Sequence, residues 1–70
     1  MVPQDSFTFS VERWTRDEIE IEQTLCRASH LLVARGAYDA ACNLDHRARL
    51  TLRQGIRLLE ERKANYAVPS

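Results

Sequence analysis

The chain has 70 residues, and its ten basic and ten acidic side chains give a formal net charge of zero. A chain this short forms one domain at most, and so small a core usually needs support from disulfides, metal or self-association. The balanced charge provides no overall attraction to nucleic acid or acidic membranes. No apolar stretch approaches the ~20 residues that span a bilayer. We therefore expect a cytoplasmic protein that binds neither nucleic acid nor a membrane.

The N-terminal part of the chain is predicted to contain one strand. Residues 1–5 are expected to be flexible, whereas residues 6–12 alternate polar and apolar side chains, which is typical of a half-buried strand or arm. No second strand is predicted. Because a lone strand leaves its backbone groups unpaired, it must pair with its symmetry mate, pair with a partner's sheet, or lie across a helix.

Residues 15–35 are predicted to form a first helix. Thr15 and Glu18 have the spacing of a capping box, in which the two residues satisfy free N–H groups at a helix start. Trp14 and Ile19 lie at the two positions of a hydrophobic staple around this cap. Gly36 follows the helix and is expected to end it in the left-handed conformation.

Residues 38–64 are predicted to form a second helix, because apolar side chains recur at helical spacing along them. Gly55 in its middle costs roughly 1 kcal/mol relative to alanine, which suggests a close helix crossing. Residues 67–70 are expected to be a loose tail. The predicted fold is therefore all-α: an antiparallel two-helix hairpin with an N-terminal strand or arm, which forms a dimeric helical bundle.

The predicted turn resembles that of a tetratricopeptide repeat. Residues 36–41 read Gly-Ala-Tyr-Asp-Ala-Ala, and Ala48 occupies the later small position. In such repeats, a Gly-x-Tyr-x-x-Ala segment joins two antiparallel helices. The resemblance implies the geometry of one hairpin, and since one repeat cannot bury its own faces, it agrees with self-association.

Two Cys–His pairs are the sharpest candidate for a chemical site. Cys26 precedes His30 by four residues, and Cys42 precedes His46 by the same distance. In a hairpin the pairs would lie side by side, and together they are a suitable ligand set for tetrahedral zinc. A free cysteine is more often a small core residue. We therefore expect no metal or cofactor and keep a zinc-stabilised hairpin as an alternative.

No catalytic constellation is predicted. Asp45 is expected to form an ion pair with Arg49 or with an arginine of another segment, since a carboxylate on an apolar helix face needs a partner. A catalytic acid would need a second carboxylate or a histidine nearby. Neither that arrangement nor a nucleophile–base pair is evident, so we expect no enzyme.

A DNA-binding repressor is a second hypothesis. The predicted order of strand, helix and helix resembles that of ribbon-helix-helix repressors, whose paired strands read the major groove. However, the outward positions of the strand include no basic side chain. The first predicted helix is also longer than such folds use.

Apolar and aromatic side chains carry the main functional prediction, because aromatic residues dominate interface energetics. The two helices supply the predicted dimer core: Ile19, Ile21, Leu25, Leu32, Val33, Leu52, Ile56 and Leu59. The remaining large side chains are the predicted anchors for a partner protein: Phe7, Phe9, Trp14, Tyr38, Leu50, Leu58 and Tyr66.

In size and predicted layout the chain resembles small phage-encoded proteins that inhibit host factors. These include the quorum-sensing anti-activators, which bind host transcriptional regulators and pilus-assembly ATPases. The resemblance implies a homodimeric inhibitor that acts in the host cytoplasm on a protein of one of these kinds. It assigns no individual residue a role.

Overall fold

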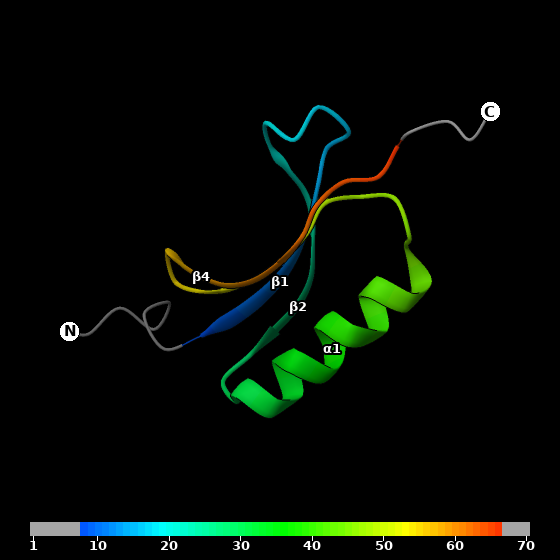
Figure 1. Ribbon diagram of the computed structural model, residues 1–70. Coiled ribbons are helices and arrows are strands. Elements are labelled where there is room, and N and C mark those ends of the chain that lie inside the picture. The colour runs from blue at the N-terminus through cyan, green and yellow to red at the C-terminus, as the bar shows by residue number, and fades with distance from the viewer. Residues whose placement is uncertain (1–7, 67–70) are drawn as a thin grey trace.

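The protein consists of two β-hairpins joined by one helix (Figure 1). The computed structural model describes residues 8–66. In chain order the elements are β1 (Phe9–Trp14), β2 (Ile21–Ala28), α1 (Leu31–Leu44), β3 (Leu50–Gln54) and β4 (Arg57–Arg62). The strands form one antiparallel sheet in the order β2-β1-β3-β4, and α1 lies across one of its faces. The prediction of an all-α hairpin bundle is therefore wrong.

The segment predicted as the first helix folds mainly into the turn of the first hairpin and strand β2. The Glu18 N–H donates to the Thr15 carbonyl at 2.8 Å, and the Thr15 N–H donates to the Glu20 carbonyl at the same distance. Glu18 has a left-handed φ of 64°. Side chains that cap helices also close turns, so the spacing of Thr15 and Glu18 was compatible with either structure.

Helix α1 occupies the centre of the chain, where a turn was predicted. His30 is its N-cap, and the imidazole Nδ1 accepts a hydrogen bond from the Leu32 N–H at 3.3 Å. At the other end, the Asp45 N–H donates to the Ala41 carbonyl at 2.9 Å. Gly36 lies inside this alanine-rich helix and does not end it. The resemblance to a tetratricopeptide turn therefore does not describe this segment.

About half of the segment predicted as the second helix forms the hairpin of β3 and β4, and its first residues belong to α1. Gln54 pairs with Arg57, which leaves a loop of two residues between the strands. Gly55 is the first of them and has a φ of 59°. Glycine at this position is typical of type II′ hairpin turns. Gly55 thus marks a hairpin turn rather than a helix crossing.

The core lies between α1 and the two central strands. Val11 of β1 and Leu50 and Leu52 of β3 are fully buried, and they pack against Ala34 and Tyr38 of the helix. Strand β1 pairs with β2 on one side and β3 on the other. Its backbone groups are therefore paired within the chain, without a symmetry mate or a partner's sheet.

Both edge strands contain β-bulges. The register of β1 and β2 skips Glu22 and Leu25, and that of β3 and β4 skips Leu59. Bulges twist an edge away from regular pairing, and natural sheets use them to prevent edge-to-edge association. The edges are therefore poor sites for adding a strand. Within the described residues, no helix is long and apolar enough to cross a membrane.

Candidate functional site

An apolar groove with a volume of about 720 Å³ lies between α1 and β2. Its apolar lining combines two residues of the strand with four of the helix: Leu25, Cys26, Ala37, Ala40, Ala41 and Leu44. The alanines keep it open because their side chains are short. Leu25 is 39% exposed and Leu44 is 86% exposed, so both leave apolar surface accessible at the groove.

The apolar surface continues along the helix beyond the groove. Val33, Ala37, Ala40 and Leu44 follow the spacing of one helix face. Leu32 lies beside Val33 in the first turn, and these two side chains are 71% and 60% exposed. We call this surface the α1–β2 patch; its large side chains are Leu25, Leu32, Val33 and Leu44.

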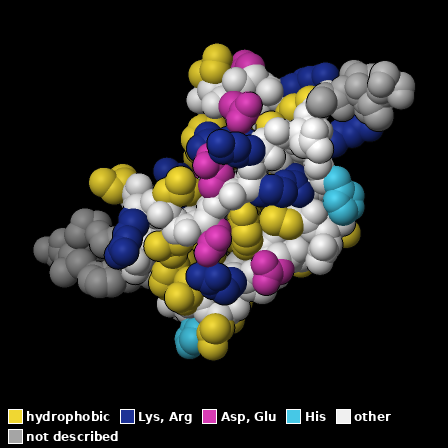
Figure 2. All heavy atoms as spheres, in the orientation of Figure 1, with side chains coloured by type: hydrophobic (Ala, Val, Ile, Leu, Met, Phe, Trp, Pro, Cys, Tyr) yellow, Lys and Arg dark blue, Asp and Glu magenta, His cyan; other side chains and the backbone are white. Residues whose placement is uncertain are grey.

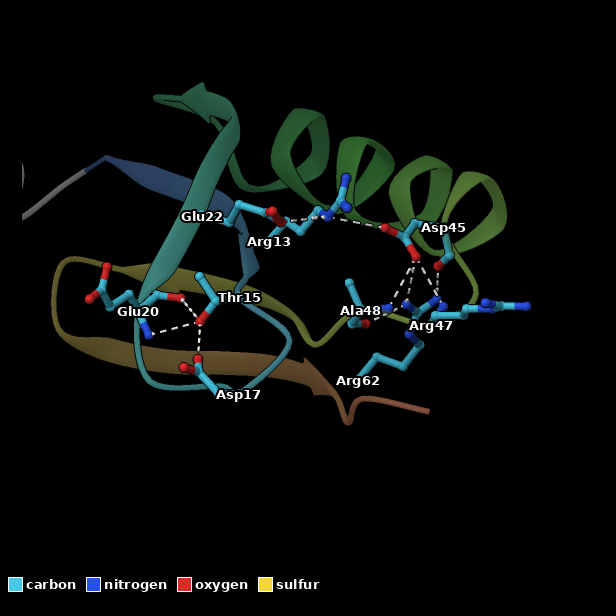
Figure 3. Close-up of polar contacts among 9 residues, drawn as sticks. All are labelled: Arg13, Thr15, Asp17, Glu20, Glu22, Asp45, Arg47, Ala48 and Arg62. Carbon is cyan, nitrogen blue, oxygen red and sulfur yellow. Dashed lines mark hydrogen bonds and ion pairs between the residues drawn. The ribbon is translucent and has the colours of Figure 1, made fainter. Parts of the chain in front are cut away.

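One end of the groove is polar and is organised by Asp45 (Figure 3). Its carboxylate accepts hydrogen bonds of 3.0 Å from the backbone N–H groups of Arg47 and Ala48. It also lies 3.3 Å from the Arg13 guanidinium and 3.9 Å from that of Arg62. The two backbone hydrogen bonds, helped by these arginines, hold the pKa of the Asp45 carboxyl below its usual value. Asp45 therefore pairs with arginines of other segments.

Arg62 closes the end of α1. Its guanidinium donates to the carbonyls of Cys42, Asp45 and Ala48. These groups include carbonyls at the C-terminal end of the helix, which carries a partial negative charge that a cation stabilises. Arg62 therefore fixes the α1–β3 connection, and we assign it a structural role.

The opposite face of the sheet carries a polar network. Arg53 donates two hydrogen bonds, of 2.5 and 2.7 Å, to the carboxylate of Glu12, which is only 5% exposed. The Trp14 indole N–H donates to the Thr51 hydroxyl at 3.0 Å, and the Arg49 guanidinium stacks over the indole at 4.4 Å. A smaller hollow of about 390 Å³ adjoins Glu12 and Arg53. Because these two charges satisfy each other, this face is a weaker candidate for a binding site.

The structure does not bring together the four residues of the alternative zinc site, Cys26, His30, Cys42 and His46. His30 precedes α1 and His46 follows it, so a helix of about 21 Å separates them. Figure 2 shows the two histidines far apart. Among the described residues, no group of three or more histidine, cysteine or acidic side chains could hold a metal ion. The ribbon-helix-helix arrangement is also absent there, because α1 is the only helix of residues 8–66.

The predicted anchors lie in varied surroundings. Tyr38 and Leu50 belong to the core, and Phe9 packs against it. Trp14 and Tyr66 are half-buried, and Arg16 stacks over the Tyr66 ring at 4.9 Å. Leu58 is 47% exposed. Phe7 lies outside the described residues.

The predicted dimer core is mostly at the surface. Leu52 is fully buried, and Leu59 packs against the core. The other members are exposed on the single copy: Ile19, Ile21, Leu25, Leu32, Val33 and Ile56. Three of them belong to the α1–β2 patch. The sequence reasoning missed Leu44 and the alanines of the groove, although their spacing with Val33 was a readable signal.

No family model, no curated protein and no solved structure matches the chain. The surface of the protein is therefore the basis for its functional assignment. In Figure 2, basic and acidic side chains alternate along the visible face, without a large area of one sign. The apolar groove is the most distinctive surface feature of the described residues.

Proposed function

We propose that this protein is a non-enzymatic protein-binding module, and that a partner docks on the α1–β2 patch. The observation that carries the proposal is the exposure of large apolar side chains around one groove. Leu32, Val33 and Leu44 are each at least 60% exposed. Monomeric proteins rarely expose contiguous apolar patches, and larger ones usually mark interaction sites.

The groove suits an apolar side chain or an amphipathic helix of a partner. Its alanine floor admits a bulky group, and helix-in-groove binding uses anchors at helical spacing. Arg13 and Asp45 at the polar end already pair with each other, so the groove offers mainly apolar contacts. Hydrophobic contact rather than charge is therefore the proposed basis of binding.

A regulatory protein is the partner class that the resemblance to phage-encoded anti-activators implies. The helical hairpin on which that resemblance partly depended is absent from residues 8–66. The resemblance is still supported by the short length of the chain and by a sequence that predicts no catalytic constellation. The partner to test is a transcriptional regulator or a pilus-assembly ATPase. We propose that this protein inhibits that partner.

The experiment compares proteins captured from a bacterial lysate by three versions of the full chain: the wild type, Leu44→Glu and Ile56→Glu. Ile56 is the matched control, because it is 98% exposed but lies in the β3–β4 turn. We expect a protein that binds the wild type and Ile56→Glu and is lost with Leu44→Glu. Equal capture by both variants, or capture by none of the three versions, would contradict the proposal.

A further inference from the structure

We infer that the α1–β2 patch is also the homodimer interface, where a second copy of this chain packs its α1 antiparallel against the first. The inference rests on the proposed function, because the same surface would bind both the partner protein and the second copy. It adds a form of regulation: the dimer covers the docking surface, so a partner competes with the second copy.

The small core of a single copy is the first argument. Among the described residues, six apolar side chains are buried, whereas eight large ones are exposed. Domains of this size commonly require disulfides, metal or oligomerisation. Both cysteines are free, and the described residues offer no metal cluster. Another copy of the chain is present whenever the protein is made, so it is the most available occupant.

The spacing along α1 is self-complementary. Val33, Ala37, Ala40 and Leu44 are separated by four, three and four residues, so they lie along one side of the helix. A two-fold axis between residues 38 and 39 brings Val33 opposite Leu44 of the second copy. The same axis brings Ala37 opposite Ala40 of the second copy, and Gly36 lies one turn before Ala40, beside this stripe. Large side chains then meet at both ends, and small ones allow the helices to approach at the centre.

Gly36 is the second structural argument. It is exposed within the helix, and a Cβ atom added to it would meet nothing within 4 Å. Glycine in a helix costs roughly 1 kcal/mol relative to alanine. The described residues therefore give no internal packing reason for a glycine here. A close helix of a second copy supplies one.

The charge distribution agrees with this occupant, and the available area limits the strength of the dimer. Arg35 pairs with Glu60 of β4, so it belongs to the flank of α1 away from β2. Val33, Ala37, Ala40 and Leu44 carry no charge, and Arg13 and Asp45 at the end of the groove pair with each other. An uncharged stripe suits a second uncharged stripe, and antiparallel helices align their dipoles favourably. The helix is about 21 Å long and roughly 10 Å wide, and β2 adds about 5 Å of width, or about 300 Å² in projection for each copy. A standard interface buries about 800 Å² per partner, so we expect a weak, reversible dimer.

The test is sedimentation equilibrium from low micromolar to near-millimolar concentration on the wild type, Gly36→Leu, Leu44→Glu and Ile56→Glu. We expect a wild-type dimer that Ile56→Glu preserves. Gly36→Leu should raise the dissociation constant about tenfold or more by crowding the centre. Because leucine favours helix more than glycine does, the same variant should resist urea at least as well as the wild type under dilute conditions. Weaker association with undiminished folding separates an interface effect from misfolding.

A wild type that stays monomeric throughout, or a Gly36→Leu dimer as tight as that of Ile56→Glu, would overturn the inference. The lysate capture remains an independent result. A monomeric wild type whose partner is lost only with Leu44→Glu would refute the dimer and leave the proposed function standing. A dimeric wild type that captures no protein would support the dimer and refute the proposed function.

Discussion

The ion pair between Glu12 and Arg53 provides a quantitative test of the fold. Glu12 lies in the central strand β1, and its side chain is 7% exposed. The Arg53 side chain of β3 is 28% exposed, and its guanidinium donates two hydrogen bonds to the Glu12 carboxylate. Glu12 also raises the pKa of Arg53 through the same hydrogen bonds. Removal of Arg53 would take both of these hydrogen bonds from a buried carboxylate, which also accepts a hydrogen bond of 3.5 Å from the Thr51 hydroxyl.

We expect Arg53→Ala to lower the free energy of unfolding by about 3 kcal/mol. Breaking a buried pair by removing one partner costs about 3–5 kcal/mol, and the partial exposure of Arg53 favours the lower limit. A 70-residue domain has a total stability of about 4–10 kcal/mol, so this variant should be marginally folded. Arg35→Ala is the matched control. Arg35 and Glu60 are 47% and 41% exposed, and exposed pairs contribute about 1 kcal/mol or less.

Urea denaturation followed by tryptophan fluorescence measures both variants. Trp14 is the single tryptophan, and its indole binds Thr51 beside the ion pair. Circular dichroism provides a second probe that does not depend on the surroundings of Trp14. Addition of Glu12→Gln to Arg53→Ala should recover part of the loss, because it removes the unpaired charge. If Arg53→Ala cost no more than Arg35→Ala, or if Glu12→Gln recovered nothing, the account of the sheet face would be wrong.

Two further predictions concern the glycines and the buried tyrosine. Gly55→Ala should lower the free energy of unfolding in urea by about 1–2 kcal/mol, because φ at Gly55 is 59°. Gly36→Ala should raise it by about 1 kcal/mol, because Gly36 lies inside a helix. Equal effects would contradict the assignment of Gly55 to a turn and of Gly36 to a helix. Burial and the neighbouring Cys42 raise the pKa of Tyr38 from 10.0 to about 12. The unfolded chain therefore ionises first, and stability should fall between pH 10 and 12 by about 2.7 kcal/mol at most. Tyr38→Phe, compared with the wild type in urea at pH 8 and pH 11, should remove this part of the alkaline loss, and an unchanged loss would refute it.

The β-bulges explain why most strands were not predicted from the sequence. Alternation along β2 is broken where Glu22 and Leu25 are inserted, and along β4 where Leu59 is inserted. Each insertion shifts the side-chain period by one residue. The apolar residues of these strands then imitate a helical spacing. Strand β1 has the same alternation that indicated an extended segment over residues 6–12, but it begins at Phe9 and ends at Trp14.

Turn chemistry was the second source of error. Thr15 and Asp17 can start a helix or close a turn, since both structures present unpaired N–H groups to side-chain oxygens. Asp17 accepts from the Ile19 N–H at 3.1 Å, inside the turn. The decision between the two structures comes from contacts distant in sequence, such as the hydrogen bond from Trp14 to Thr51. A pattern read along a short window contains no information on such pairings.

The exposed apolar residues of the proposed binding surface were partly predictable from the sequence, whereas the fold that carries them was not. Leu32 and Val33 were identified as apolar side chains that a single copy could not bury, and they are exposed on α1. Complete burial of such a side chain contributes about 1.5–3 kcal/mol, and most of that contribution is unused in the single copy. Polar substitutions there should therefore cost little folding stability, whereas substitutions of Leu50 or Leu52 would remove contacts that the core already has. This difference separates an interaction surface from a core, and it follows from burial rather than from periodicity.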